Sequence, residues 1–358
     1  MKNVRRHLVT AAACILFVNM LLAFFAGYPF SPAVDRAPAW ERIMAKVRPD
    51  PQLPFPPIVH QVFLSHGSLD WRAEAEPQRR AWMQTWEDAN KGRSRQAQLT
   101  HIVWDAASVV HLLQTRFDAS VFEAYSRIAS ELHHVVAGDF VRYALLWYFG
   151  GIYADTDTIC HRPIEKFALG RKDVEVIVAV EHASGFNKHN QTDIVQWTMI
   201  AAPRHPFLKQ VLDSLTAKIL VRDSFAGFKT SDILPFSGPN FWTHSLAAYL
   251  ERFNESFAGL PHPLQGTREY VPDAKFARTP EAMKRKGDEA VFFQGSKVLV
   301  LPINSFLADS DWAHPFGIHH PLSFVTHKGT GSWPEGWQNQ MAKLEEDHAE
   351  KVLKQDKE

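Results

Sequence analysis

The sequence predicts an α/β domain built around a mostly parallel central sheet, and three observations favour that class. Strand candidates alternate with helical segments from residue 56 to residue 306, which is typical of a parallel sheet covered by helices. Residues 174–182, VEVIVAVEH, are nearly continuously apolar and β-branched, as expected of a strand buried on both faces. The chain has 358 residues, 46% of them hydrophobic, which is enough for one large or two small domains.

The first elements of this domain are two strands and the helices that follow them. Residues 56–64, PPIVHQVFL, are predicted to open the domain as a buried strand, and residues 81–91 have a helical pattern. Residues 99–105, LTHIVWD, form a second strand candidate that ends on Asp105. Residues 106–132 are predicted to be mostly helical.

The clearest element is a helix within residues 129–151, ASELHHVVAGDFVRYALLWYFGG. Gly150 and Gly151 are expected to end it, because glycine adopts the left-handed conformation of a helix C-terminus without steric cost. A strand at residues 152–155 then follows directly. The apolar stripe of the helix consists of Val135, Phe140, Tyr143, Ala144, Trp147 and Tyr148.

The remaining segments complete the predicted sheet. Residues 195–203 are a strand candidate, residues 205–220 a helix and residues 297–306 a late strand. Residues 336–358 are charged and polar, which indicates a peripheral helix or tail.

The N-terminus has the pattern of a membrane anchor. Residues 8–28 carry no charge and match the ~30 Å hydrocarbon core, and the Lys and Arg of residues 1–7 place that tail in the cytosol. A cleavable signal peptide is the alternative, although its apolar region is usually about 7–15 residues. Dense proline in residues 29–54 predicts an extended stem, followed by one luminal domain over residues 55–335.

Three other features agree with a luminal domain and narrow its partners. Glycosylation sequons begin at Asn190 and Asn254. The formal net charge is zero, which argues against nucleic acid as a partner. Cys14 and Cys160 fall on opposite sides of the predicted membrane boundary, so no intrachain disulfide is expected, and Cys160 is interpreted as a small buried residue.

Asp155 and Asp157 carry the chemistry that the sequence suggests. In an extended segment residues i and i+2 face the same way, so both carboxylates are predicted on one side, with Thr156 and Thr158 on the other. Adjacent carboxylates repel each other, and a hard divalent cation such as Mg²⁺ or Mn²⁺ resolves that conflict. The pair is therefore suited to holding a metal–diphosphate complex.

Two other groups of charged residues have structural interpretations, one in a loop and one on a helix. Asp309 and Asp311 repeat the same spacing in a turn-rich stretch, which indicates a loop with local Asx turns. Asp139 and Arg142 share a face of the predicted helix at i and i+3, where an ordinary surface ion pair is the simplest interpretation.

Residues 137–164, AGDFVRYALLWYFGGIYADTDTICHRPI, resemble the signature of glycosyltransferase family 32, the sugar-transferring family with the DXD motif. The resemblance covers roughly residues 56–333. Its other blocks occur in the family's order and are PPIVHQVF (56–63), LTHIVWDAAS (99–108), VQWTMIAAPRHPFL (195–208), FSGPNFWTHSL (236–246) and VTHKGTGSW (325–333).

This resemblance implies a single catalytic domain of GT-A fold, a nucleotide-sugar donor and a requirement for Mn²⁺ or Mg²⁺. It implies that Asp155 contacts the ribose or sugar side of the donor and that Asp157 binds the metal directly. The same resemblance assigns Asp139 and Arg142 to the hydroxyl groups of the donor sugar.

Further residues receive roles only through the resemblance. His327, Ser332 and Trp333 would close over the diphosphate, with His327 or Ser332 reaching the metal. His60 and Gln61 would lie at the nucleotide end of the first strand.

The acceptor side is where the chain departs from the family pattern. The family's acceptor loop corresponds to Gly238, Pro239 and Asn240, and Asn240 stands where glycine is usual. Arg204 also replaces a glycine. Phe63 stands on the nucleotide side where the family usually has tryptophan. Acceptor identity is therefore less well determined than the donor side.

The resemblance implies transfer of mannose from GDP-mannose to a mannose-containing glycan, with retention and an α-1,6 linkage on an N-glycan outer chain. It implies a single-pass type II protein of the Golgi membrane, with its catalytic domain in the lumen and membership of a mannosyltransferase complex. Mannosyl transfer to inositol phosphorylceramide, or another hexosyl transfer to a glycan or glycolipid, is the first alternative.

Two other classes of protein compete with this interpretation. In an aspartyl-nucleophile phosphatase Asp155 would attack phosphorus and Asp157 would act as acid and base, but Ile159 stands where that motif has Thr or Val. The second competing class is a luminal lectin or scaffold protein without enzymatic activity.

The remaining conspicuous side chains have mostly structural interpretations. Trp82 and Trp86 are expected in the core, and the pairs His133–His134 and His319–His320 are expected to be structural. Polar residues that could line an acceptor groove are Asn187, Gln191 and Gln196.

Overall fold

The computed structural model describes residues 39–51, 53–64, 75–91, 99–130, 134–182, 193–225, 228–256, 290–306, 318 and 321–330. The chain divides into two compact units, Met1–Ala45 and Lys46–Glu358. The predicted membrane span and the polar C-terminal tail lie outside the described residues. Within the described ranges, no helix combines the length and apolar character needed to cross a bilayer.

The first unit contributes one described helix, α2 (Ala39–Met44). It lies inside the segment predicted as an extended stem, so that prediction is wrong for these six residues. The helical sequence AWERIM contains no proline. Pro38 directly precedes it in the sequence, and a proline at that position does not interrupt the hydrogen bonds of a helix. The proposed boundary at residue 55 also runs through packed chain, because Leu53 and Phe55 are buried in the core of the second unit.

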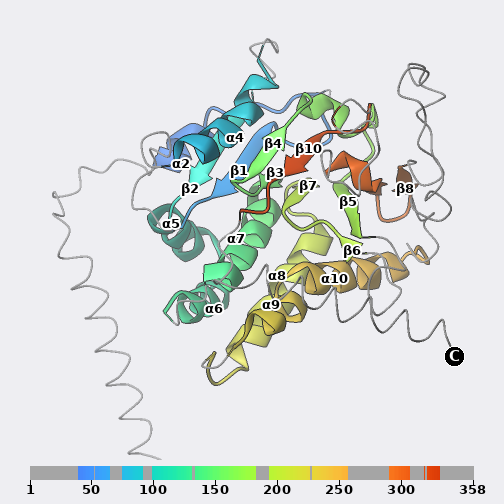
Figure 1. Cartoon of the computed structure of the whole chain (residues 1–358). Helices are drawn as coiled ribbons and strands as arrows, with labels where there is room; N and C mark the ends of the chain where they lie inside the picture. The colour runs from blue at the N-terminus through green and yellow to red at the C-terminus, as the bar shows by residue number, and fades with distance from the viewer. Residues whose placement is uncertain are drawn as a thin grey trace, which may run out of the picture. The chain divides into compact units, whose positions relative to one another are not determined.

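The second unit is built on a mixed eight-stranded sheet with the order β2-β1-β3-β7-β5-β9-β8, and β6 pairs with β5 (Figure 1). The pairs β1–β2, β1–β3 and β5–β9 are parallel, whereas β3–β7, β5–β7, β5–β6 and β8–β9 are antiparallel. Five strands, β1, β2, β3, β5 and β9, therefore run in one direction and three run in the other. The predicted α/β class with a mostly parallel sheet is confirmed. The strands are β1 (Ile58–Val62), β2 (Thr100–Trp104), β3 (Gly151–Ala154), β5 (Val176–His182), β6 (Asp193–Ile194), β7 (Thr198–Ala201), β8 (Val291–Phe293) and β9 (Val298–Leu301).

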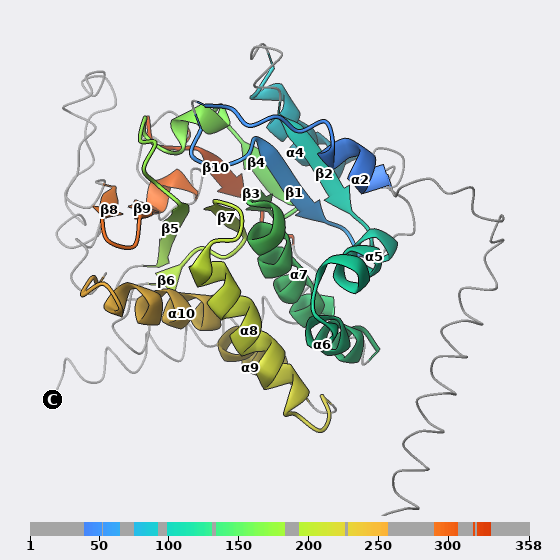
Figure 2. The same cartoon turned by 180° about the vertical axis from the view of Figure 1, so that it is seen from behind.

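Helices cover one side of this sheet, and α6, α7, α8 and α10 lie together there in both views (Figures 1 and 2). Helix α7 packs directly on β1, β3 and β7. On the other side, α4 packs on β4 of a separate two-stranded ribbon, β4–β10. These elements are α4 (Pro77–Asp88), α5 (Ala106–Arg116), α6 (Ala119–Ser130), α7 (His134–Phe149), α8 (Pro206–Leu220), α9 (Thr230–Phe236), α10 (Pro239–Glu251), the short 3₁₀ helices η2 (Ile164–Lys166) and η3 (Ile303–Ser305), β4 (Thr158–Cys160) and β10 (Val325–His327).

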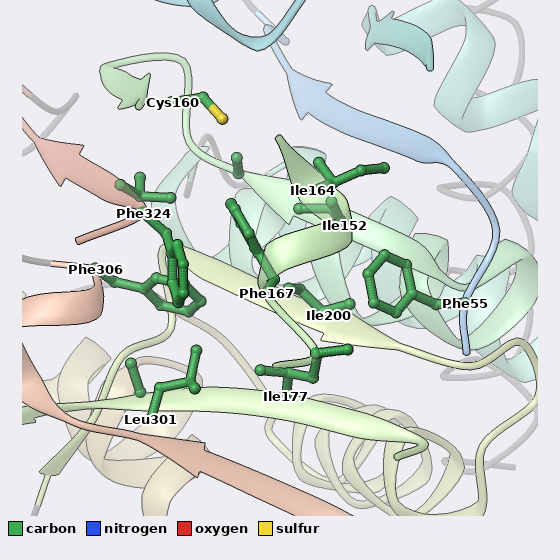
Figure 3. Close-up of a cluster of buried hydrophobic side chains, with 14 of the residues drawn as sticks. Phe55, Ile152, Cys160, Ile164, Phe167, Ile177, Ile200, Leu301, Phe306 and Phe324 are labelled. Carbon is green, nitrogen blue, oxygen red and sulfur yellow. The ribbon is translucent and has the colours of Figure 1, made fainter. Parts of the chain in front are cut away.

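Alternate residues of the strands form a hydrophobic core between the sheet and the ribbon (Figure 3). Ile152, Ile177 and Ile200 point to this side from three neighbouring strands. Phe167 packs among them and stacks on Phe324, with ring centroids 4.8 Å apart. The opposite face of the sheet packs on α7, so the sheet is buried on both faces, as its β-branched strands predict.

The two glycines after α7 explain how the chain turns from the helix into β3. Both have positive φ, 65° at Gly150 and 88° at Gly151. A Cβ at Gly151 would lie 2.7 Å from the carbonyl oxygen of Ile58, and one at Gly150 would lie 2.5 Å from the backbone nitrogen of Pro203. Glycine is therefore required here for both conformation and space.

We expect Gly151→Ala to lower the free energy of unfolding by about 2 kcal/mol or more, because it adds a clash to an unfavourable φ. Gly170→Ala is the matched control, since Gly170 has φ of 78° but a Cβ added there would have no neighbour within 4 Å. Urea unfolding of both variants measures the difference. Equal losses at the two positions would contradict the close approach of Gly151 to β1.

Candidate active site

The two aspartates lie in a tight turn between β3 and β4, not in an extended strand. Asp155 follows the end of β3, and residues 156–157 form the turn. The prediction that both carboxylates lie on one side because residues alternate along a strand is therefore wrong, since these residues do not form a strand. The turn is held at the Asp155 carbonyl, which accepts hydrogen bonds from the Thr158 hydroxyl at 2.6 Å and from Gln61 Nε2 at 3.1 Å.

The turn nevertheless brings three potential metal ligands together. One ligand atom each from Asp155, Asp157 and His327 lies within 4.8 Å of the others. His327 arrives on β10, which pairs antiparallel with β4 so that His327 is opposite Thr158. Its imidazole stacks on Trp197, with ring centroids 4.5 Å apart and an interplanar angle of 8°. These are three of the four residues predicted to bind the metal; the fourth, Ser332, lies outside the described residues. The sequence could not predict the strand pairing that brings His327 to the two aspartates.

Asp157 is the buried member of the cluster, and its surroundings favour the ionised form. Its Oδ1 lies 3.3 Å from His327 Nε2, and its Oδ2 accepts hydrogen bonds from the backbone N–H and the hydroxyl of Thr330 at 2.8 and 3.2 Å. Although burial opposes the charge, the hydrogen bond from His327 and the charges of His327 and Arg79 lower the pKa of Asp157 to about 2. For His327, burial is outweighed by Asp157, so its pKa is raised.

This donor set fits a hard divalent cation. Two carboxylates and one imidazole suit Mn²⁺, which accepts oxygen and nitrogen ligands, and they leave coordination positions for substrate oxygens. Asp155 has a partly exposed side chain, and so does His327, with 26% and 23% of each side chain accessible. Both can therefore reach an ion at the surface of the site.

Asp139 and Arg142 form a buried pair next to this cluster, so the interpretation as a surface ion pair is wrong. Only 3% of Asp139 and 9% of Arg142 are exposed. Arg142 Nη2 lies 3.4 Å from Oδ1 of Asp139 and 3.4 Å from Oδ1 of Asp155. One guanidinium therefore joins helix α7 to the turn, and its face covers the ring of Tyr153 at 5.0 Å.

Polar groups on three elements hold the other side of Asp139. Its Oδ2 accepts a 2.7 Å hydrogen bond from the Ser237 hydroxyl. Gln196 Nε2 donates to the Ser237 carbonyl at 2.9 Å and to the Tyr143 hydroxyl, which itself donates to that carbonyl at 2.8 Å. Burial, with a contribution from the negative charge of Asp155, raises the pKa of Asp139 to about 7, although the charge of Arg142 and the hydrogen bond from Ser237 oppose this shift.

His60 and Gln61 have internal partners in place of the expected nucleotide contact. His60 is fully buried, with Nε2 3.0 Å from the Gly150 carbonyl oxygen and Nδ1 accepting from Trp104 Nε1 at 3.1 Å. Burial lowers the pKa of His60 to about 4, and the neutral ring has no nitrogen left for a ligand. Gln61 is also buried. Its Oε1 lies 2.8 Å from His101 Nε2 and its Nε2 donates to the Asp155 carbonyl, so Gln61 supports the turn.

The expected acceptor loop lies close to the Asp139–Arg142 pair. Gly238 precedes α10, and Pro239 and Asn240 begin that helix and are half-buried. The preceding residue, Ser237, is the one that contacts Asp139, so the loop and the buried pair are directly connected. Gln196 is buried in this network and does not face an open groove.

Other predicted residues have simpler placements. Asn254 is exposed, which leaves its sequon accessible, and Trp86 is in the core, while Trp82 is half-buried. Cys160 is a buried free thiol, as predicted. Ser332, Trp333, Asn187, Gln191, Asn190, His133, the pair His319–His320 and the second acidic pair, Asp309 and Asp311, lie outside the described residues.

Sequence reasoning missed several residues that support the site. Tyr153 donates a 2.6 Å hydrogen bond to Asp155 Oδ1, and strand alternation two residues before Asp155 could have suggested it. Ser237, which contacts Asp139, directly precedes the predicted acceptor loop that begins at Gly238. Arg79, which contacts Thr156 between the two aspartates, has no sequence signal that distinguishes it from other helix-surface arginines.

The segment that contains most of this site matches a known family model. Residues 78–178 match the model described as a glycosyltransferase sugar-binding region containing the DXD motif. The matched segment includes α7, β3 and the turn with both aspartates, and excludes His327 and Ser237.

Curated relatives are similar to this chain over most of its length. The chain is 24% identical over 277 residues to the initiation-specific alpha-1,6-mannosyltransferase of Candida albicans, covering 71% of this chain and 66% of that protein. It is 24% identical over 213 residues to inositol phosphoceramide mannosyltransferase 1 of Schizosaccharomyces pombe, covering 59% and 57%. The chain thus spans somewhat less than two thirds of each of these relatives. Among solved structures, the PaToxG glycosyltransferase matches at a TM-score of 0.38 and 18% identity, covering 58% of this chain and 74% of that one, which is too distant to identify a fold.

The raised pKa of Asp139 predicts a specific pH dependence of stability. Because the folded-state pKa of about 7 exceeds the ordinary value of 3.8, the folded chain retains a proton between these values that the unfolded chain releases. Stability should therefore fall as pH rises from about 4 to about 7, by at most about 1.4 kcal/mol per pH unit from this group.

Asp139→Asn should remove this contribution. Chemical unfolding in EDTA at about pH 5 and about pH 7.5, on either side of the raised pKa, should show a smaller loss of stability for this variant than for the unmodified chain. Asp173→Asn, at an exposed residue, serves as the control. Equal losses for all three proteins would show that Asp139 ionises normally.

Proposed function

We propose that this chain, a glycosyltransferase whose sugar-binding region contains the DXD motif, transfers mannose from GDP-mannose to a mannose-containing glycan. The proposal includes retention at the anomeric carbon, a GT-A fold and a preference for an α-1,6 linkage on an N-glycan outer chain. Of the two relatives described above, one is named for an α-1,6 linkage and the other for the acceptor inositol phosphoceramide, but both names state mannosyl transfer, so mannose is the better supported part.

One observation carries this proposal. Asp155, Asp157 and His327 converge beside a buried Asp139–Arg142 pair, and Arg142 contacts an aspartate of each group. A site for a cation and a site able to bind hydroxyl groups are thus side by side, which is the arrangement that a nucleotide sugar with its diphosphate and hexose requires.

The chemistry that this arrangement supports is a displacement at the anomeric carbon. Asp155, Asp157 and His327 would hold a divalent ion, which supplies charge neutralisation for the departing diphosphate when bound. Arg142 adds a fixed positive charge on the same side, an electrostatic effect that grows as the leaving group becomes charged.

The proton balance needs no separate base from the chain. The bond between the anomeric carbon and the phosphate oxygen breaks, the acceptor oxygen bonds to that carbon from the same face, and the leaving phosphate takes the acceptor proton. Asp139 would hold a sugar hydroxyl, since Ser237 and Arg142 fix its orientation. We therefore assign Asp139 to donor-sugar binding and name no catalytic base.

The alternatives suggested by the sequence differ in their support. The match to a glycosyltransferase family removes the aspartyl phosphatase interpretation. Transfer to inositol phosphorylceramide stays open as the second acceptor class, because one relative is named for that acceptor. We also propose a type II Golgi membrane protein with a luminal catalytic domain, which rests on the charge pattern of residues 1–28 and the sequon at Asn254.

We expect Asp157→Ala to lower transfer by at least about 100-fold while the chain still folds, since it removes the buried ligand of the cation. Asp157→Asn should behave similarly with less disturbance of shape. Asp173→Ala, which changes an exposed aspartate paired with Arg171, is the matched control and should retain activity. Normal turnover by the Asp157 variants with Mn²⁺ would overturn the assignment.

Assay of the full chain with a panel of nucleotide sugars should select GDP-mannose over UDP-sugars, with turnover lost in EDTA and restored by Mn²⁺. The anomeric configuration of the product, read by NMR, tests retention. Binding of GDP without turnover on mannosides or inositol phosphorylceramide would instead indicate a lectin or scaffold.

A further inference from the structure

Arg79 links the two segments that surround Asp157. It lies near the start of α4, where Nη1 donates a 2.7 Å hydrogen bond to the hydroxyl of Thr156, the residue between the two aspartates. Its Nη2 donates to the hydroxyl of Thr330 at 3.4 Å. Because Thr330 in turn bonds Asp157 Oδ2, the guanidinium lies beside the carboxylate that is best placed to bind the cation.

The charge of Arg79 has no direct counterion in the described part of the chain. The two hydrogen bonds that it makes to described residues both end on neutral hydroxyl groups. A guanidinium has about five N–H donors in a planar fork, so most of the donors of Arg79 have no partner among the described residues. By contrast, Arg142 is shared between Asp139 and Asp155, and His327 faces Asp157. Arg79 is therefore the cation of this site with the greatest unused capacity for an anion.

The anion that suits this position is a phosphate group. Bidentate recognition by guanidinium is matched to phosphate oxygens, and a diphosphate held by a cation at Asp157 would extend next to Thr156 and Thr330. We propose that Arg79 binds the diphosphate of the donor, an inference that rests on the nucleotide-sugar function proposed above.

Binding of Mn²⁺ without nucleotide distinguishes a purely structural role of Arg79 from a role as a phosphate ligand. If Arg79 only braces the turn, its removal should disturb Asp157 and weaken binding of Mn²⁺ and of phosphate together. If Arg79 is a phosphate ligand, its removal takes a positive charge away from the cation site. Mn²⁺ binding without nucleotide should then be unchanged or become a few-fold tighter, while diphosphate binding weakens.

The experiment uses the full chain and two probes, GDP and inorganic pyrophosphate, each titrated by calorimetry at fixed Mn²⁺. Arg79→Ala should weaken both by about 10-fold to 100-fold, and Arg79→Lys by less, since it keeps the charge but loses the fork. Titration of Mn²⁺ alone, followed by electron paramagnetic resonance, supplies the second readout.

Arg80→Ala is the matched control, because Arg80 is on the same helix but donates to the Ala75 carbonyl. It should leave all three titrations unchanged. Unaltered pyrophosphate binding in Arg79→Ala, or parallel loss of pyrophosphate and Mn²⁺ binding, would overturn the proposal. If the unmodified chain binds pyrophosphate but not GDP, the nucleotide assignment fails while the role of Arg79 is still decided by pyrophosphate.

Discussion

The contact on which the site depends most is the guanidinium of Arg142 between two carboxylates. It joins α7, through Asp139, to the turn after β3, through Asp155. A charged group is costly to bury unless it is paired, and here one cation serves two acids. The pairing fixes the distance between the helix and the turn, and it leaves a net negative charge that a bound cation or a retained proton can compensate. One side chain therefore contributes both to the placement of α7 against the turn and to the charge of the site.

The surrounding fold keeps that triad in place. The positive φ values of Gly150 and Gly151 let α7 turn directly into β3, so Asp139 and Asp155 face each other across a short connection. Tyr153 donates to Asp155, and Gln61 and Thr158 hold its backbone carbonyl. All of these hydrogen bonds join groups of the protein itself, so they orient the carboxylates before any ligand binds. This orientation lowers the entropic cost of binding.

Much of the fold could be predicted because the signals are local. The helix that ends at Gly150, the β-branched strand β5 and the strand that starts at Ile58 follow from periodicity, propensity and glycine placement. The sequence did not predict the ribbon β4–β10, because three-residue strands have no detectable period and the pairing partner is distant. Helix α10 was also missed, since its first residues were interpreted only as an acceptor loop. The reversal of β7 was also not predictable, since a strand pattern does not specify direction.

The candidate site divides in the same way. Asp139, Arg142, Asp155 and Asp157 lie in one continuous block, so the sequence could identify them together, but it did not predict that Asp139 and Arg142 are buried. His60 was misassigned because a polar residue in a buried strand can point to the helix layer as well as to a ligand, and its neighbours Trp104 and Gly150 are distant in sequence. Arg79 and Ser237 depend on tertiary contacts alone, so residue type and spacing could not identify them.

The pairing of β10 with β4 joins residues 165 positions apart, as in the contact between His161 and Thr326. Closing so long a segment costs little more entropy than closing one of half that length, because the cost grows only with the logarithm of length. The larger effect is on timing. During synthesis from the N-terminus, β1, β3 and the aspartate turn emerge well before β10, so the two carboxylates are synthesised before their imidazole partner. The growing chain thus acquires Asp155 and Asp157 early and His327 near the end of translation.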